Sequence, residues 1–207
     1  MHPYLEDINR DEEMNIVTEE VQIDGKDTYY FHRYEPTPYL VLDVLFDELE
    51  LGEDDIILDY GSGLGRVLLY ANYKMGCKGI GVEYSAHYFD LAYENLRAYV
   101  KKFDMKVAPI RFINQSAVDY DVPDFINMIY FFNPFSTEVF RTVLTKIQIS
   151  FERAPREITF IIYYPEDETI FYIENHTSFS LVREIAGSDN VVNDRRDRFA
   201  IYSNKYE

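Results

Sequence analysis

Short apolar runs alternate with longer amphipathic stretches along most of the chain after residue 50. The apolar runs cover residues 56–59, 79–83, 110–114, 125–132 and 158–164. This alternation is typical of βαβ units and of a mostly parallel sheet. Residues 129–132, at the end of one run, are continuously apolar, and residues 158–164 are apolar except for Thr159. We expect these two runs to be central strands, because such strands are covered by helices on both faces.

Apolar residues recur at three- and four-residue spacing after Ser85 and after Ser136, which predicts two amphipathic helices. Each serine can cap its helix, because a serine oxygen accepts an N–H of the first turn. The residues expected to face the core are Tyr88, Ala92, Leu96, Tyr99 and Phe103 in the first helix, and Val139, Phe140, Val143, Leu144 and Ile147 in the second.

The two ends of the chain carry further signals. Residues 179–184 and 198–202 predict two strands joined by the polar segment 187–197, and hence a closing antiparallel hairpin. Near the other end, residues 21–23 and 28–31 flank an Asp-Gly-Lys turn, which predicts a second hairpin. Thr37 as cap and Pro38 in the first turn predict a helix that continues to about Leu49.

Taken together, these elements predict an α/β fold with a Rossmann-like, doubly wound, mostly parallel sheet. It closes with a C-terminal antiparallel hairpin and carries a short N-terminal extension. We expect one domain over residues 1–207, with the extension in residues 1–35 and the core in residues 36–207. A chain of 207 residues with 47% apolar residues buries enough surface to fold without disulfide or metal support.

Composition narrows the location and the cofactors. The single cysteine, Cys77, excludes an intrachain disulfide and fits a reducing compartment. No basic start is followed by an apolar run, and no stretch reaches the ~20 apolar residues of a membrane span. We therefore expect a cytoplasmic protein with no membrane association. The four histidines show no metal-ligand spacing, so no metal site is expected.

The formal net charge of −17 disfavours nucleic acid as a partner, because nucleic-acid binders normally present clustered Lys and Arg. The basic cluster of Arg195, Arg196 and Arg198 is interrupted by Asp197 and preceded by Asp194. This pattern indicates a solvated loop. An acidic total does not forbid a local basic groove, so nucleic acid stays open at this point. The sequence predicts no oligomeric state.

The most informative segment is residues 56–69, where an apolar strand enters a glycine-rich turn and then a helix. Gly61, Gly63 and Gly65 stand at alternate positions, and the lack of Cβ lets the backbone turn sharply and approach a ligand. Glu83 ends the next strand, where a carboxylate can accept both hydroxyl protons of a ribose. Together these features predict a nucleotide-like ligand; a tight structural loop is the alternative.

The spacing of the glycines and the position of Asp59 decide between ligands. Dinucleotide folds place Gly-x-Gly-x-x-Gly after the strand, with the pyrophosphate on the helix N-terminus. This chain has Gly-x-Gly-x-Gly, with Asp59 two residues before the first glycine. A carboxylate there repels a pyrophosphate but attracts the methionine ammonium of S-adenosylmethionine (SAM), directly or through water. A nicotinamide-dependent oxidoreductase and a non-catalytic SAM-binding protein remain the alternatives.

At these residues the chain resembles the class I SAM-dependent methyltransferases. Residues 59–65 match their Asp/Glu-x-Gly-x-Gly-x-Gly motif, Glu83 matches their ribose-binding acid, and the resemblance spans roughly residues 37–202. Residues 133–135, the helix after them and the later Tyr-Tyr-Pro resemble small bacterial members without an assigned substrate. The resemblance implies a methyltransferase that uses SAM and releases S-adenosylhomocysteine. The cofactor contacts that we expect are Asp59, Gly61, Ser62, Gly63, Gly65, Glu83, Ser116, Ala117, Asn133, Tyr34 and Thr37.

Among these, Ser116 and Ala117 follow the third strand, where the family places the adenine. Many members have an acidic residue there, and this chain has none before Asp119. Tyr34 and Thr37 precede the sheet and, by the same resemblance, fold over the methionine end of the cofactor. Packing and helix entry are the alternative roles for both residues.

Asn133, Pro134 and Phe135 are the expected catalytic residues, because they leave a central strand at the edge where parallel sheets bind ligands. The Asn133 side-chain carbonyl and the Pro134 backbone carbonyl can accept hydrogen bonds from an amine, which aims its lone pair at the methyl group. Phe135 can stack on a planar acceptor.

This segment resembles the Asn-Pro-Pro-Tyr/Phe motif of methyltransferases that act on adenine amines and glutamine amides, with one proline missing. The alternative is that the segment only ends a strand and opens a helix. On charge grounds the candidate acceptors are a protein side chain, a small amine and a nucleobase, in declining order.

Overall fold

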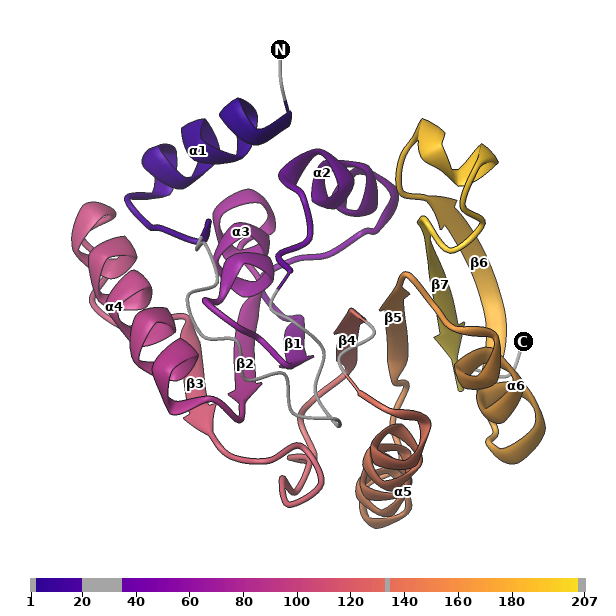
Figure 1. The fold of residues 1–207 in the computed structure, drawn as a ribbon. Coiled ribbons are helices and arrows are strands. Elements are labelled where there is room, and N and C mark those ends of the chain that lie inside the picture. The colour runs from indigo at the N-terminus through magenta and orange to yellow at the C-terminus, as the bar shows by residue number, and fades with distance from the viewer. Residues whose placement is uncertain (1–2, 20–34, 133–134, 205–207) are drawn as a thin grey trace.

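The computed structural model describes residues 3–19, 35–132 and 135–204, and these residues form one seven-stranded sheet (Figure 1). The strand order is β3-β2-β1-β4-β5-β7-β6. The first five strands pair in parallel, and β7 pairs antiparallel with both β5 and β6. The predicted fold class is therefore confirmed. The strands are β1 (Ile56–Tyr60), β2 (Lys78–Glu83), β3 (Ile110–Asn114), β4 (Met128–Phe132), β5 (Thr159–Tyr163), β6 (Ser180–Ala186) and β7 (Arg198–Ser203).

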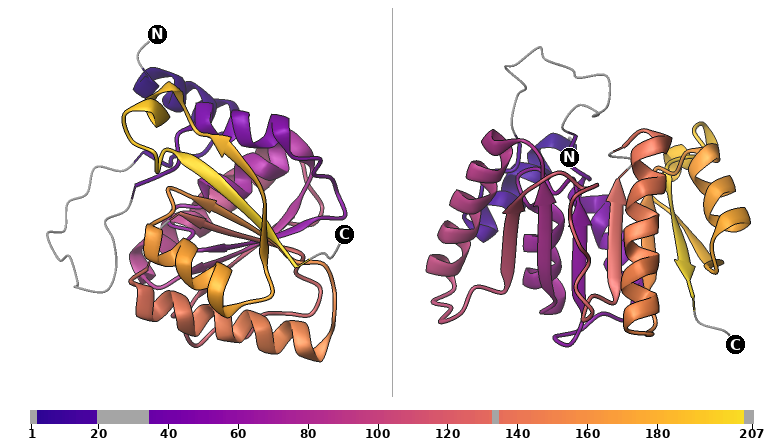
Figure 2. Two further views of the ribbon diagram at one scale, coloured as in Figure 1. Left: turned by 90° about the vertical axis from the view of Figure 1, so that its right-hand side faces the viewer. Right: turned by 90° about the horizontal axis from the view of Figure 1, so that it is seen from below.

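Helices cover both faces of the sheet, as the two side views show (Figure 2). One face carries α2, α3 and α4, and the opposite face carries α5 and α6. Side chains alternate between these two cores along each strand, so that Ile57 packs with the first core and Leu58 with the second. The helices are α1 (Pro3–Met14), α2 (Tyr39–Glu48), α3 (Arg66–Met75), α4 (Ala86–Lys102), α5 (Thr137–Arg153) and α6 (Asp167–His176), with a 3₁₀ turn at Asp189–Val192.

The strand order reverses beside β1, which pairs with β2 on one side and with β4 on the other. Asp59 of β1 stands opposite Gly81 of β2 and Tyr130 of β4. In open α/β sheets the crevice at such a reversal is where ligands bind. The glycine-rich turn follows β1 and therefore enters this crevice.

Three expected details are wrong. The strand predicted from residue 125 begins at Met128, because residues 123–126 form a turn in which the Ile126 N–H donates to the Pro123 carbonyl. The side chain of Phe125 is accordingly 59% exposed. Phe103 is also exposed, since α4 ends at Lys102 and leaves Phe103 as its C-cap.

The third correction concerns Thr37, which does not cap α2. The helix begins at Tyr39 with Pro38 as its N-cap, and Thr37 is fully buried instead. Its hydroxyl shares a 2.8 Å hydrogen bond with the Tyr130 hydroxyl on β4. The hydroxyl that would cap the helix is therefore engaged with the sheet.

Two helices, α1 and α6, have no counterpart among the expected elements. The pattern around α6 is weakly amphipathic, and Ile173 is its buried residue. Helix α1 turns Asp7, Asp11 and Met14 inward, so that two of its three described buried side chains are carboxylates. An inward face of this kind gives no apolar periodicity. The hairpin predicted for residues 21–31 lies outside the described residues.

Within the described part of the chain, no helix has both the length and the apolarity that crossing a bilayer requires.

Candidate functional site

Main-chain hydrogen bonds join the glycine-rich turn after β1 to the end of β2. Gly61, Gly63 and Gly65 have φ angles of 78°, 50° and 88°, a region that side chains with Cβ rarely adopt. The N–H groups of Gly61 and Ser62 donate to the Val82 carbonyl at 2.9 and 3.2 Å. The turn is thereby fixed to the end of β2, and α3 begins immediately after it at Arg66.

Phe112 of β3 fills the space beneath this turn. A Cβ atom added at Gly65 or at Gly81 would lie 2.4 or 2.5 Å from the Phe112 ring, which is closer than van der Waals contact allows. Close packing favours glycine at both positions, and the positive φ of Gly65 favours it there as well. Phe112 was not among the residues expected at the site, because in the sequence it reads as an ordinary strand residue.

Glu83 lies at the end of β2 and faces the glycine turn. One carboxylate oxygen accepts the N–H of Gly63 at 2.9 Å, and the other accepts the N–H of Ser85 at 2.8 Å. Burial raises the pKa of Glu83, and these main-chain donors oppose that rise. The structure thus brings Glu83 and the predicted glycines together, as the sequence predicted.

Asp59 is the second buried carboxylate of the site, with 3% of its surface exposed. Burial, and next the charge of Glu83, raise the pKa of Asp59 to about 8. Among the described residues, no Lys or Arg forms an ion pair with Asp59 or Glu83. Asp59 and Glu83 thus form a buried acidic pair with no cationic partner among the described residues. Such a pair fits a ligand with positive charge, and SAM carries positive charge at its ammonium and sulfonium groups.

One polar atom in the turn is also left without a described partner. The Ser62 hydroxyl is buried and forms no hydrogen bond with any described residue. A buried hydroxyl normally has a partner, so this atom is available to a ligand at the turn. The residues present therefore fit the expected cofactor.

The start of the loop after β3 is hydrogen-bonded to the main chain of Glu83. The Gln115 N–H donates to the Glu83 carbonyl at 3.0 Å, and the Asn114 side-chain amide donates to the carbonyls of Glu83 and Tyr84. Ser116 follows directly and is half-buried, whereas Ala117 is buried in the core of the second face. Ser116 therefore follows a residue that is hydrogen-bonded to Glu83, whereas the side chain of Ala117 packs in the core.

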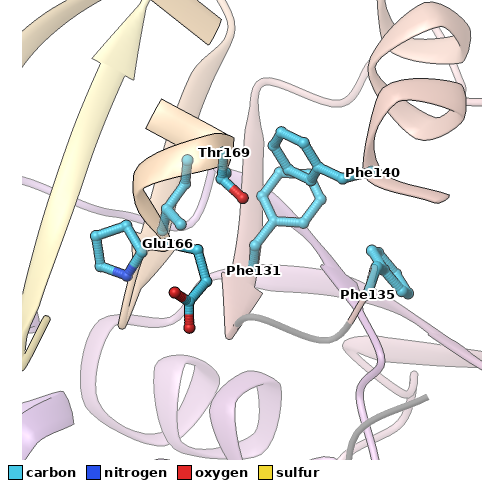
Figure 3. A pocket seen from close by; sticks show the side chains of 7 residues that line it. Phe131, Phe135, Phe140, Glu166 and Thr169 are labelled. Carbon is cyan, nitrogen blue, oxygen red and sulfur yellow. The ribbon is translucent and has the colours of Figure 1, made fainter. Parts of the chain in front are cut away.

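On the other side of the strand reversal, a pocket lies where β4 and β5 end. Figure 3 shows phenylalanine rings facing Glu166 and Thr169 across this pocket. Phe135, predicted to contact the acceptor, is one of the rings and packs edge-on against Tyr60 at 6.2 Å. We call this set of residues the aromatic pocket; it is lined by Phe131, Phe135, Phe140, Ile162, Pro165, Glu166 and Thr169.

Several predicted site residues cannot be placed in this arrangement. Asn133, Pro134 and Tyr34 lie outside the described residues. Ser136 is the N-cap of α5, as predicted, but its side chain makes no cap hydrogen bond. Ser85 does cap α4, since its hydroxyl accepts the Tyr88 N–H at 3.4 Å.

The segment that follows β5 forms one wall of the aromatic pocket and is braced by the β6–β7 loop. Tyr164 has a φ of 55°, which is rare for a residue with Cβ, and its ring lies 4.7 Å beneath the Arg196 guanidinium. Arg196 also pairs with Asp194 and, at 3.0 Å, with Glu166. The basic cluster of the sequence is thus largely neutralised by acidic neighbours, and Glu166 belongs both to the pocket and to this brace.

Among the described residues, no group of three or more His, Cys, Asp and Glu side chains could hold a metal ion.

Comparison with known proteins identifies one family. The model of the histone methylation protein DOT1 family matches residues 32–149, which is more than half of the chain. No curated protein matches the chain.

Solved structures share the fold at low sequence identity. An RNA methyltransferase from Salinibacter ruber, in complex with S-adenosyl-L-homocysteine, is 18% identical with a TM-score of 0.59, covering 84% of this chain and 95% of its own. A geranyl diphosphate C-methyltransferase from Streptomyces coelicolor is 11% identical with a TM-score of 0.56, covering 80% and 77%. Magnesium protoporphyrin IX methyltransferase from Synechocystis is 14% identical with a TM-score of 0.54, covering 81% and 77%.

Proposed function

The chain belongs to the family of the histone methylation protein DOT1, and from this premise we propose that it methylates a nitrogen of a protein side chain or of a small amine. The family makes the chain a SAM-dependent methyltransferase, and the identity of the acceptor is our proposal. A nicotinamide-dependent oxidoreductase is accordingly no longer favoured. The observation that carries the donor side is the pair of buried carboxylates, Asp59 and Glu83, beside the glycine turn.

We assign the donor contacts as follows. Glu83 accepts the ribose hydroxyls, and Asp59 attracts the ammonium group of the methionine part. The turn of Gly61, Gly63 and Gly65 lets the backbone approach the ligand, with Ser62 offering its free hydroxyl. We assign Ser116 and Ala117 to the adenine, and Tyr34, Thr37 and Asn133 to the methionine end.

SAM supplies a methyl group that is already activated by the sulfonium, so the protein contributes mainly alignment and exclusion of water. The rings of Phe131, Phe135 and Phe140 line a small apolar pocket at this edge of the sheet, and in this proposal they exclude water from an acceptor that binds beside it. Glu166 places a carboxylate at the pocket, which attracts an ammonium group or accepts an N–H. In this proposal Asn133 and Pro134 orient the acceptor nitrogen through their carbonyl oxygens.

Protein is favoured over nucleic acid as the acceptor for two reasons. The family description names a histone, which is a protein. The net charge of −17 also repels a polyphosphate chain. The similar structures include enzymes named for RNA, porphyrin and geranyl diphosphate, so the fold alone selects no acceptor.

Label transfer tests this proposal. The protein is incubated with methyl-labelled SAM and a cell lysate, and portions are then treated with protease or with nuclease. We expect label that protease releases from the macromolecular fraction, or label in small amines, and methylated nitrogen in the hydrolysate by mass spectrometry. Label released only by nuclease would contradict the proposed acceptor, although the methyltransferase class would stand.

A further inference from the structure

The N-terminal residues 3–19 lie outside the family match, which begins at residue 32, yet they contact the start of α3 and are linked to the glycine turn through Asn95. Figure 1 shows α1 lying over α3, in the same layer as α2. The contacts of residues 17–19 with the helices of the core are polar and at least partly buried. They are made by the side chains of Arg66 in α3 and Asn95 in α4.

Arg66 directly follows Gly65 and is 2% exposed. Its Nε donates to the Thr18 hydroxyl at 2.7 Å, and its Nη1 donates to Asp7 at 3.1 Å and to the Thr37 carbonyl at 3.2 Å. Its Nη2 pairs with Glu19. One buried guanidinium thus joins α1, residues 18–19 and the Thr37 segment to the end of the glycine turn.

Buried carboxylates on α1 complete this network. Asp7 accepts the Tyr39 N–H at 3.0 Å, and Asp11 accepts the Thr18 hydroxyl at 2.7 Å. The Tyr39 ring lies 4.5 Å from the Arg66 guanidinium and its hydroxyl donates to Asp11. A buried cation is stable only when it is paired and hydrogen-bonded, so Arg66 and the α1 carboxylates depend on each other.

Asn95 makes a second connection on the other side of Gly65. Its side-chain oxygen accepts the Val17 N–H at 2.9 Å, and its amide nitrogen donates to the Val17 carbonyl at 2.9 Å and to the Leu64 carbonyl at 3.0 Å. Leu64 and Arg66 flank Gly65, so the turn is anchored immediately before and immediately after this glycine.

These anchors matter because glycine is the residue with the most backbone freedom to lose. A turn with three glycines at positive φ has little intrinsic preference for one shape, and ordering it costs conformational entropy. A turn that is already ordered in the free protein binds its ligand more tightly, because less entropy is lost on binding.

We propose that Arg66 and Asn95 are positioning residues of the methyl-donor site, through which residues 3–19 hold the glycine turn and the Thr37 segment in the shape that accepts the donor. The identity of the ligand rests on the function proposed above; the mechanical coupling of the turn to residues 3–19 does not. The N-terminal segment is therefore part of the donor site although none of its described residues belongs to the glycine motif.

A matched pair of asparagines tests the proposal in the full chain. Asn72 of α3 also bridges two groups, donating to the Cys77 carbonyl at 2.7 Å and accepting from the Tyr99 hydroxyl at 2.8 Å, but it joins the far end of α3. We expect Asn95→Leu to weaken S-adenosylhomocysteine binding about tenfold in isothermal titration and to raise the KM for SAM with kcat less affected. Asn72→Leu loses thermal stability while keeping its affinity.

Thr18→Val provides a second variant of nearly unchanged shape, which breaks the link from Arg66 to Asp11 on the N-terminal side. Hydrogen exchange of the free protein gives a readout that needs no ligand. We expect amides 61–66 to exchange about tenfold faster in Asn95→Leu and Thr18→Val than in the wild type and in Asn72→Leu.

The outcomes separate the two proposals. Wild-type affinity and wild-type exchange at residues 61–66 in both folded variants would overturn the positioning role, and so would an equal loss of affinity in Asn72→Leu. If the wild-type protein binds no S-adenosylhomocysteine, the assigned donor site fails, and the exchange measurement alone decides whether residues 3–19 hold the turn.

Discussion

The donor side and the acceptor side of the strand reversal are built in different ways. The proposed donor side consists of Asp59, the glycine turn and Glu83, which lie within 25 consecutive residues, and N–H groups of the turn donate to the Val82 carbonyl and to the Glu83 carboxylate. The aromatic pocket collects side chains from Phe131 to Thr169, which come from two strands, two helix entries and a connecting segment.

This difference teaches where specificity resides. In the proposed assignment, the donor side binds its ligand through charge and backbone shape, which few replacements can reproduce, so its motif is readable in the sequence. The proposed acceptor side presents an apolar surface with a carboxylate, and many combinations of residues can supply such a surface. A shared donor side with a variable acceptor side is how one fold serves several reactions.

The largest expected effect is at the donor side. Replacing both buried carboxylates, Asp59→Ala with Glu83→Ala, removes the groups that we assign to the ligand ammonium and to the ribose. We expect S-adenosylhomocysteine binding to fall by about 100-fold or more in isothermal titration, since losing a buried charged partner costs about 2–5 kcal/mol. Glu48→Ala, which removes an exposed ion pair with Arg183, is the control. Unchanged affinity in the folded double variant would refute the donor assignment.

Asn133→Ala tests whether the two sides separate functionally. We expect turnover to fall about 100-fold while affinity for S-adenosylhomocysteine changes little, because orientation of the acceptor acts on the chemical step. Steady-state kinetics with labelled SAM and titration of the same preparation measure the two quantities. Asn193→Ala, an exposed loop variant, serves as the control. Unchanged turnover would favour the alternative role of Asn133 as a strand end.

Glu166→Gln sharpens the comparison within the acceptor side. The change keeps the shape but removes the charge facing the aromatic pocket, and we expect the KM for a cationic acceptor to rise about tenfold. Glu184→Gln is the matched control, since Glu184 of β6 also pairs with an arginine, Arg198 of β7, but does not line the pocket. If both variants raise KM equally, the ion pairs that Glu166 and Glu184 form with arginines govern acceptor binding, and the charge of Glu166 in the pocket does not.

The smallest expected effect is a pH dependence of the free energy of unfolding, which follows from the Asp59 pKa of about 8. Unfolding lowers that pKa toward ~4, so between about pH 4 and pH 8 the folded protein holds a proton that the unfolded chain has released. The free energy of unfolding therefore falls as pH rises through this window.

We expect Asp59→Asn to reduce this pH dependence and to stabilise the free protein at pH 8 by about 1 kcal/mol or more, or about 2–4 °C. Thermal unfolding from pH 5 to pH 8 measures it, with Asp55→Asn as the control for a half-buried carboxylate. An equal slope in wild type and Asp59→Asn would show that Asp59 is ionised in the free protein. Affinity for SAM should rise toward pH 8, because its ammonium favours the carboxylate form.

The sequence determined the α/β fold and the donor motif. The strands of the parallel sheet were predictable because they are buried on both faces and read as apolar runs, and the closing hairpin was predictable from its turn-rich connection. The glycine turn was predictable because positive φ and close approach leave few alternatives to glycine. Glu83 was predictable because its position is fixed by the end of the next strand.

Only the tertiary structure decided the remaining contacts. Helix α1 gave no apolar signal because its buried face carries Asp7 and Asp11, whose partner Arg66 lies about 60 residues away in the chain. Phe112 and Asn95 read as ordinary strand and helix residues until folding places them against Gly65 and Leu64. Local patterns record how a segment is buried, whereas the partner of a buried polar group is set by the packing of distant segments.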